Sequence, residues 1–459
     1  MREVAIVGAG VAGLSVAFEL LRRTKDCSVR VYEAEAVPGG NIHTDHVEGF
    51  TVEWGPNGFL DNVPETLDLV ERLGMAERLL PASQSSKRRF IWRAGRLHEI
   101  KANPLAFLAS GVLSWPGKLR LMAEPFSDTR PGGDETVFDF AVRHIGAEAA
   151  AVLVDAMVSG VFAGNARELS LQSAFPRMHQ MDLEYGSLVR AMVSKLRDRK
   201  SGVPSGGPTG PAGHLTSFKG GMSDLIDGLT RAVGAERIRC GCPVQSVAPL
   251  TRHRFTVRLA DGSSEDADAV VLAVPAWHAT PLVRACAPEM AAEMDRIPGA
   301  PLCVVALGFR RGEVEHPMNG FGFLVPRGEA LTILGSLWTS SIFPGRAPEG
   351  FVLLRTMVGG AHAPHLAAQS DDALYRLVRD DLRTAMGIAA APTSRRIYRH
   401  RHGIPQYVVG HQERLDRIEA MCRHLGGLYV TGNSYVGIAV NACVRAAGPL
   451  AEKVLAELP

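Results

Sequence analysis

The sequence predicts an α/β protein with a discontinuous Rossmann-like nucleotide-binding domain and a second domain built on a mixed sheet. The first observation is a β-branched run at residues 4–7, which leads through a glycine-rich turn into an amphipathic helix. The second is the continuously apolar run at residues 269–275, which is typical of a buried parallel strand. A third strand-like run, residues 427–432, ends in glycine before the last helix. The second sheet is expected from strand-like runs at residues 302–309, 321–325, 332–337 and 352–358.

The composition limits the classes of protein to consider. The 459 residues predict two or three domains. The charges nearly balance to a formal +2, so a nucleic-acid-binding role has no electrostatic support. Seven cysteines are scattered, and the only close pair, Cys240 and Cys242, lacks metal-ligand spacing. We therefore expect reduced thiols. No run of eighteen apolar residues occurs, so no membrane span is expected.

The N-terminal turn carries the first functional motif. It is a G-x-G-x-x-G sequence whose glycines are Gly8, Gly10 and Gly13. Such glycines permit a tight turn, a close approach of backbone to a pyrophosphate, and close packing of helix on strand. A second strand, residues 28–32, ends at Glu33, whose carboxylate should accept hydrogen bonds from an adenosine ribose. The spacing predicts a bound dinucleotide. Because the first strand begins at residue 4, we expect no targeting peptide and a cytoplasmic protein.

A second glycine motif favours FAD over a nicotinamide cofactor. Glu33 is followed at short spacing by the pair Gly39 and Gly40, then Asn41. This pattern resembles the second fingerprint of the flavin-dependent amine oxidase superfamily, in which the glycine pair lies along the phosphate and ribityl chain of the flavin. A turn with Gly55 and Pro56 ends the next strand-like run. In that superfamily, such a turn passes over the flavin ring.

The part of the chain between residues 64 and 198 is predicted to contain helices and a strand-like segment at residues 90–92. Helices are expected over residues 64–80 and 139–161. The apolar run 104–115 is too short to span a membrane, and Trp115 ends it. Two interpretations stay open for this run: an interfacial anchor or a buried helix. Residues 198–214 are predicted to be a flexible linker rich in Gly, Pro and Ser.

The basic run Lys87-Arg88-Arg89 also has two interpretations. Such a run forms a solvated surface in many proteins, but arginine also presents a planar fork that suits propionate or acetate groups. Elsewhere the sequence contains no Ser-His-Asp or Cys-His arrangement. The histidine pairs at 362 and 365 and at 400 and 402 lack supporting acids at suitable spacing, so no metal site is predicted. After the last strand, a helix N-terminus would face the ribityl or pyrimidine edge of the flavin.

Taken together, the chain resembles the oxygen-dependent protoporphyrinogen oxidases nearly from end to end. The more specific motifs that carry this resemblance are SGVFAGN (159–165) with ELS (168–170), GFGFLVP (320–326), GIPQY (403–407) with GH (410–411), and GNSYVGIAVN (432–441).

The resemblance implies a domain organisation. An FAD domain would comprise residues 1–80, 214–285 and 421–459, and a substrate domain residues 81–98 and 286–420. A helical membrane-binding domain would occupy residues 99–200, followed by a linker at 201–213.

The resemblance also implies the site residues. The expected FAD-binding residues are Gly8, Ala9, Gly10, Val11, Ala12, Gly13, Glu33, Ala34, Gly40, Asn41, Gly55, Pro56, Asn57, Gly58, Val244, Gly432, Ile438, Ala439 and Val440. The expected substrate-binding residues are Arg89, Phe321, Gly322, Leu324, Leu337 and Met357. Arg89 would pair with a propionate, while Phe321, Leu324 and Leu337 would enclose the macrocycle. One position departs from part of the family: some members carry Arg after the Gly-Pro turn, where this chain has Asn57.

The activity that the resemblance implies is the six-electron oxidation of protoporphyrinogen IX to protoporphyrin IX by FAD and dioxygen, with release of hydrogen peroxide. No catalytic acid or base is expected, because pyrrole N–H protons can leave to solvent. The protein would be a homodimer at the cytoplasmic face of a membrane and would hand its product to a ferrochelatase.

Alternative functions stay open at this point. Oxidation of coproporphyrinogen III, a tetracarboxylate, would need more basic groups, and Lys87, Arg88 and Arg93 could serve. An amine oxidase would need an aromatic cage, for which Tyr435 has no obvious partner in the sequence. A carotenoid-type desaturase is a weaker alternative. A flavin-binding scaffold without enzymatic activity is the remaining one.

Overall fold

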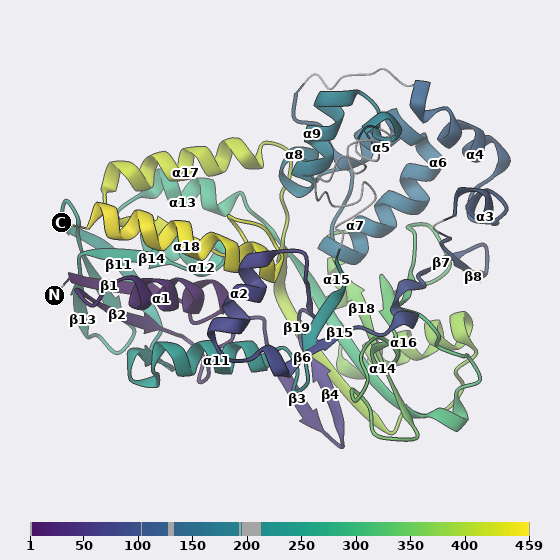
Figure 1. Ribbon diagram of the computed structural model, residues 1–459, viewed down its shortest axis with the longest axis horizontal. Helices are drawn as coiled ribbons and strands as arrows, with labels where there is room; N and C mark the ends of the chain where they lie inside the picture. Colours follow the sequence, from purple (N-terminus) through teal and green to yellow (C-terminus); the bar gives the residue numbers. More distant parts are fainter. Residues whose placement is uncertain (1, 102, 127–132, 192–193, 195–212, 459) are drawn as a thin grey trace.

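The structure is a computed structural model that describes residues 2–101, 103–126, 133–191, 194 and 213–458 (Figure 1). Figure 1 shows two lobes: both chain termini lie in one lobe, and the other has a second sheet with a group of helices above it. Residues 201–212 of the predicted linker lie outside the described residues. No helix in the described ranges is long and apolar enough to cross a membrane.

The first lobe is built on a five-stranded parallel sheet. Its strand order is β10 (Ile238–Arg239), β2 (Cys27–Tyr32), β1 (Arg2–Val7), β14 (Ala269–Leu272) and β20 (Leu428–Val430). Every neighbouring pair is parallel. The strands come from the beginning, the middle and the end of the chain, so the predicted discontinuous parallel sheet is confirmed.

Both faces of this sheet are buried, which explains the apolar character of its strands. On one face Val4 and Ile6 pack against helices α1 (Val11–Arg23), α11 (Ser223–Val233) and α18 (Val440–Glu457). On the other face, Ala5 and Val7 belong to a core shared with other elements. These are β11 (Val244–Thr251), β12 (Arg254–Leu259), β13 (Ser264–Ala267), α12 (Ala276–Val283), α13 (Pro288–Asp295) and α17 (His411–Leu425).

The second lobe contains a seven-stranded mixed sheet. Its order is β19 (Ser394–Pro405), β15 (Gly299–Arg310), β18 (Phe351–Gly359), β17 (Gly335–Leu337), β16 (Gly322–Leu324), β7 (Phe90–Arg93) and β8 (Arg96–Glu99). The pair β16 and β7 is parallel, and the other pairs are antiparallel. One face packs against α16 (Asp371–Met386). Short helices α14 (Thr339–Ile342) and α15 (Pro364–Ala367) complete this lobe.

The other face of the mixed sheet is the one that matters for the site. One end is covered by the hairpin of β3 (Thr44–Val47) and β4 (Phe50–Glu53), whose Phe50 and Val52 pack against it. The other end lies against α7 (Asp155–Phe162), whose Ala156 shares a core with Leu324. A small sheet of β5 (Phe59–Leu60), β9 (Leu215–Phe218) and β6 (Leu79–Pro81) lies beside the nucleotide lobe.

The helical segment between β8 and β9 contains α3 (Pro104–Leu108), α4 (Trp115–Met122), α5 (Val137–Ile145), α6 (Ala147–Ala149), α7, α8 (Leu171–Ala174) and α9 (Pro176–Tyr185). Residues 139–161 are helical as predicted at every position except Gly146, but they form successive helices rather than one. Gly146, at φ +84°, ends α5, and a π-helical turn over Ala150–Val154 precedes α7. The helix predicted over 64–80 was too long, because α2 (Pro64–Arg72) ends just before Gly74, at φ +67°, and residues 79–81 form β6.

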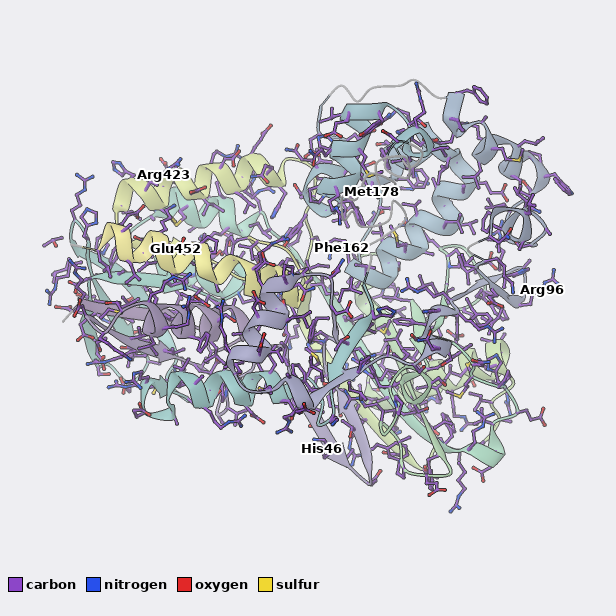
Figure 2. All side chains as sticks on the ribbon, in the orientation of Figure 1. His46, Arg96, Phe162, Met178, Arg423 and Glu452 are labelled. Atoms are coloured by element: carbon purple, nitrogen blue, oxygen red, sulfur yellow. The ribbon has the colours of Figure 1, made fainter. Side chains whose placement is uncertain are left out.

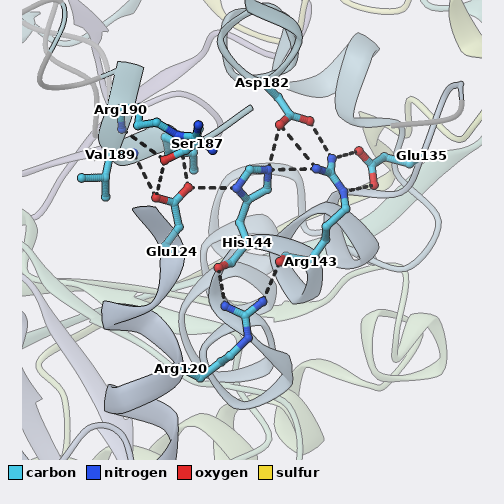
Figure 3. Close-up of polar contacts among 10 residues, drawn as sticks. Arg120, Glu124, Glu135, Arg143, His144, Asp182, Ser187, Val189 and Arg190 are labelled. Carbon is cyan, nitrogen blue, oxygen red and sulfur yellow. Dashed lines mark hydrogen bonds and ion pairs between the residues drawn. The ribbon is translucent and has the colours of Figure 1, made fainter. Parts of the chain in front are cut away.

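A buried polar network holds this helical segment together (Figure 3). His144 Nδ1 lies 2.9 Å from a carboxylate oxygen of Glu124, and its Nε2 lies 2.8 Å from one of Asp182. Arg143 bonds to Asp182 and Glu135. Burial alone would raise the pKa of Glu124. Hydrogen bonds from His144, Ser187 and two backbone N–H groups outweigh that effect and lower the pKa to about 2. The network therefore fixes α5, α9 and the segment around residue 187 to one another.

Candidate cofactor and active site

The glycine turn after β1 has no room for side chains where a phosphate would approach. A Cβ atom on Gly13 would lie 2.0 Å from the carbonyl oxygen of Gly8, and Gly8 itself has φ +103°. Helix α1 begins at Val11, and its N-cap, Gly10, provides no side-chain hydrogen bond. The first N–H groups of a helix have no intrahelical acceptor, and the helix dipole favours an anion there. The turn therefore fits a pyrophosphate, as predicted from the sequence.

Glu33 lies directly beside this turn. It follows β2 and is almost completely buried. One of its carboxylate oxygens accepts a hydrogen bond from Ala9 N–H at 2.7 Å, and the other accepts one from Glu35 N–H at 3.1 Å. Cys242 N–H, two residues before Val244, donates to the carbonyl of Glu33. Each carboxylate oxygen keeps a further lone pair, so Glu33 is able to accept from ribose hydroxyls.

The second glycine motif extends the same strip. Gly39 pairs with Gly10 in a parallel bridge, and its N–H donates to the Ala9 carbonyl at 3.0 Å. A Cβ on Gly40 would lie 3.4 Å from the Gly10 Cα. Further along, a Cβ on Gly55 would lie 2.2 Å from the Asn41 carbonyl oxygen. A continuous backbone cradle therefore runs from the first turn through Gly40 and Asn41 to the Gly55–Gly58 loop.

The C-terminal segment borders this cradle from the opposite side. Gly432, at φ +105°, lies where a Cβ would come within 3.9 Å of the Ala12 side chain. Ala439 is the N-cap of α18 and provides no side-chain cap, so the N-terminus of a second helix is free of a competing acceptor. Asn441 in its first turn donates to the Leu60 carbonyl at 2.8 Å, which fixes this helix end close to the small sheet.

The predicted substrate residues are brought together by the register of the mixed sheet. Leu324 lies opposite Gly335, which lies opposite Met357, and Gly322 lies opposite Leu337. Leu324, Leu337 and Met357 share one face of the sheet and are half-buried. Helix α7 closes over this face, because a Cβ on Gly160 would lie only 2.4 Å from a methyl carbon of Leu324. The face offers an apolar surface against which a flat ring can pack.

Arg89 and Phe321 lie at the edge of this face. The Arg89 guanidinium carbon lies 5.2 Å from the centre of the Phe321 ring, and Arg89 is exposed. The Phe321 N–H donates to the carbonyl of Arg88, which joins the two segments. Within the described residues, no carboxylate forms an ion pair with Arg89. A ligand carboxylate could therefore occupy it.

The neighbouring cations are already paired. Arg88 donates to both oxygens of Glu99, at 3.1 and 3.0 Å. These hydrogen bonds, together with one from Lys101, lower the pKa of Glu99 to about 2. Arg93 donates to Glu329 at 2.7 Å. The cations of this region are thus divided: Arg88 and Arg93 belong to internal ion pairs, whereas Arg89 and the exposed Lys87 have no carboxylate partner among the described residues.

One buried cation was missed by the sequence analysis. Arg355 on β18 is only 2% exposed, and it lies opposite Leu337 in the sheet. Its guanidinium donates to the Gly55 carbonyl at 2.8 Å and to the Asn57 side-chain oxygen at 3.1 Å. Burial lowers its pKa to about 10. A single arginine inside the apolar strand FVLLRTMVG was the signal that could have indicated it.

Other candidate chemistry lies elsewhere. Tyr435 packs into the core on the far side of the parallel sheet and does not lie on the apolar face, so it does not form an amine oxidase cage there. All seven cysteines are free of disulfides in the structure. Across the described ranges, no group of three His, Cys, Asp or Glu side chains could hold a metal.

Figure 2 shows Phe162, the last residue of α7, near the middle of the molecule. Its carbonyl accepts a hydrogen bond from Gln406 there.

Comparison with known proteins gives a consistent result. The model of the family described as flavin-containing amine oxidoreductase matches residues 11–455. The protoporphyrinogen oxidase of Homo sapiens is 30% identical, with the match covering 100% of this chain and 99% of the human one. The coproporphyrinogen III oxidase of Bacillus subtilis is 28% identical, covering 96% of each. A crystal structure from Exiguobacterium sp. 255-15 superposes with a TM-score of 0.85 at 25% identity over 99% of both chains. Cyclohexylamine oxidase from Brevibacterium oxydans, at 17% identity and a TM-score of 0.71 over 100% of this chain and 99% of that one, shares the fold.

Proposed function

We propose that this chain, which belongs to the family of flavin-containing amine oxidoreductases, is an FAD-dependent oxidase whose substrate is protoporphyrinogen IX. The observation that carries the proposal is the apolar sheet face of Leu324, Leu337 and Met357 with the unpaired guanidinium of Arg89 at its edge. A porphyrinogen is a largely apolar macrocycle of four pyrroles joined by methylene bridges, with carboxylates at its rim, and this arrangement suits both parts. The relatives named protoporphyrinogen oxidase in Homo sapiens and Arabidopsis thaliana support the same substrate.

The chain's own residues bind and orient the substrate and exclude water. Leu324, Leu337 and Phe321 would enclose the macrocycle, and Arg89 would fix one propionate by a charge-assisted hydrogen bond. Bound FAD would supply the two-electron acceptor, and three turnovers with dioxygen as the final oxidant would remove six electrons and release hydrogen peroxide. The bridging carbon of a porphyrinogen is activated by its two flanking pyrroles. No protein base is therefore needed, because pyrrole N–H protons can leave to solvent.

Coproporphyrinogen III is the second candidate substrate, since the Bacillus subtilis relative carries that name. It has four carboxylates, so it would need additional free cations around the apolar face. Of the three cations that could serve it, Arg88 and Arg93 are held by Glu99 and Glu329, and only Lys87 is without a carboxylate partner among the described residues, which favours a substrate with fewer carboxylates. The test is the initial rate of porphyrin fluorescence with each porphyrinogen under air. We expect the higher kcat/KM with protoporphyrinogen IX; a higher value with coproporphyrinogen III would assign the second activity.

We also propose that the helical segment contacts a membrane surface. Trp115, Leu119, Met122 and Phe126 follow one another at helical spacing on and just after α4, and Leu105 lies on α3. These five side chains are between 53% and 88% exposed. In Figure 1, α3 and α4 lie at the end of the molecule away from the nucleotide-binding sheet. A group of exposed apolar side chains of this kind is typical of an interfacial anchor. The protein would then act in the cytoplasm at the membrane face.

Co-sedimentation with anionic phospholipid vesicles tests this surface. The triple variant Leu105→Ser, Trp115→Ser, Phe126→Ser should lose most of its vesicle binding. In the wild type, each of these apolar side chains would transfer from water into the membrane interface, and serine does not gain free energy from that transfer. The matched control is Leu250→Ser with Val37→Ser, two apolar residues that are 55% exposed on the nucleotide lobe. If the triple variant and the control variant bind vesicles equally well, the helical segment is not the membrane contact.

The family resemblance supports two further proposals about partners. A homodimer is the expected state, and light scattering on the purified holoenzyme would measure its mass. Transfer of the product to a ferrochelatase is the other proposal. If the product is transferred directly, an added apoprotein that binds free porphyrin should not slow metal insertion in a coupled assay of the two enzymes.

A further inference from the structure

We propose that Arg355 is a positioning residue that holds the Gly55–Gly58 loop and places a fixed positive charge at the flavin-ring end of the cofactor cradle. This inference rests on the FAD site alone and does not depend on which porphyrinogen is oxidised. It extends the site by one residue that no sequence motif contains.

The first observation is that Arg355 is a buried guanidinium without a carboxylate partner among the described residues. Its two terminal nitrogens donate to the Gly55 carbonyl and the Asn57 side chain, while its Nε has no hydrogen-bond partner. The Nδ2 of Asn57 is also buried and without a partner. Two unused donors therefore belong to two side chains that are hydrogen-bonded to each other where the loop meets the sheet. Buried donors of this kind carry a substantial cost unless an acceptor reaches them.

The second observation is that the nearest acid does not neutralise this charge. Glu53 accepts hydrogen bonds from Thr44 and from Met222 N–H, and its carboxylate lies 3.4 Å from the guanidinium of Arg346. Burial also raises the pKa of Glu53. Two buried guanidinium groups thus share one acid. The excess positive charge is located at Arg355, next to the loop.

The third observation connects Arg355 to the cofactor strip. Gly55 packs against the Asn41 carbonyl, and Gly40, the residue before Asn41, packs against Gly10 of the phosphate-binding turn. The Gly55–Gly58 loop is therefore the end of the cradle opposite the phosphates, where the ring of a dinucleotide-type flavin would lie. The oxygen and nitrogen acceptors at the edge of that ring are suitable partners for the two unused donors.

A fixed cation at this position has a defined effect. The ring gains electron density when it is reduced, and a nearby positive charge in a site shielded from water stabilises that density. Arg355 would therefore raise the reduction potential of the bound flavin. It would also explain how the chain tolerates Asn57 in the loop, because the cation comes from β18 instead.

The test is a reductive titration of the purified holoenzymes, without any porphyrinogen. Arg355→Met should lower the equilibrium constant for flavin reduction by about tenfold or more, which for a two-electron couple is about 30 mV per factor of ten. Arg355→Lys keeps the charge and should retain most of the potential. Adding Asn57→Arg to Arg355→Met should restore it from the loop. Arg414→Met, which removes another buried arginine from α17, should leave the potential unchanged.

Two results would overturn the proposal. An unchanged potential in Arg355→Met with a lower thermal unfolding temperature would reduce Arg355 to a structural role. An unchanged potential with a KM for the porphyrinogen raised about tenfold would make it a substrate carboxylate ligand instead. If Arg355→Met does not yield holoenzyme, Arg355→Gln gives the same comparison. Loss of FAD from both neutral variants but not from Arg355→Lys would support the proposal, because charge rather than shape would then decide binding.

Discussion

Glu124→Gln should destabilise the helical segment, and the stability of this segment should then depend less on pH in the acid range. The Glu124 carboxylate accepts hydrogen bonds from Ser187 Oγ at 2.8 Å, Leu188 N–H at 2.6 Å and Val189 N–H at 3.1 Å, and it lies next to His144. A glutamine has one acceptor oxygen, so its amide nitrogen would face donors that it cannot satisfy. Replacing one partner in such a buried network costs roughly 3–5 kcal/mol.

The pH dependence gives an independent magnitude. The pKa of Glu124 is about 2 in the folded protein, against a usual value of 4.5. Because one pKa unit corresponds to about 1.4 kcal/mol, the ionised carboxylate contributes on the order of 3 kcal/mol. Since the folded pKa is depressed, this stability is present above the unfolded pKa and is lost as the pH falls from about 5 to about 2.

Amide hydrogen exchange of α5 and α9, corrected for the intrinsic pH effect, measures this local free energy. The wild type should lose protection progressively as the pH falls from about 5 to about 2. Glu124→Gln should start with lower protection, and its protection should change less with pH. Glu184→Gln on α9 is the control, because Glu184 is exposed and bonds only to Gln180 among the described residues. Parallel acid profiles for wild type and Glu124→Gln would show that the Glu124 carboxylate does not contribute this stability.

The remaining predictions concern the cofactor turn and the substrate edge. Gly13→Ala should abolish stable FAD binding, because its Cβ would lie 2.0 Å from the Gly8 carbonyl oxygen. The ratio of flavin to protein absorbance measures this, and Gly312→Ala, which has open space, should keep the wild-type ratio. Arg89→Ala should raise the KM for protoporphyrinogen IX about tenfold or more with little change in kcat, since a lost charge-assisted bond is worth about 1.5–3 kcal/mol. Arg88→Ala should have a much smaller effect, and the reverse order would contradict the role given to Arg89.

The sequence predicted the features that depend on local pattern. The glycine turn, Glu33 and the apolar strands are defined by neighbours in the chain, and each lies where the pattern indicated. The helical segment predicted over 139–161 is interrupted only at Gly146, because the apolar periodicity continues past a residue whose positive φ ends α5. The apolar run 104–115 is mixed: Val112 and Leu113 are buried, while Leu105 and Trp115 are exposed. The apolar periodicity of the sequence alone does not show which of these side chains are buried and which are exposed.

The site could be predicted only as far as motifs reached. Arg89, Phe321 and Leu337 came from the family resemblance, and the parallel pairing of β7 with β16 explains why such distant segments meet. Arg355 could not be predicted in the same way, because its contact with Asn57 joins residues 298 positions apart. The pairing of Arg88 with Glu99 was equally hidden, since it depends on the hairpin of β7 and β8.

Anaerobic mixing of the yellow holoenzyme with protoporphyrinogen IX shows whether this porphyrinogen reduces the bound flavin. We expect rapid bleaching of the flavin absorbance, with recovery and appearance of porphyrin fluorescence when air is admitted. Coproporphyrinogen III should bleach the flavin more slowly at the same concentration. Flavin that stays oxidised with both porphyrinogens would contradict the assignment, even if the protein binds FAD tightly.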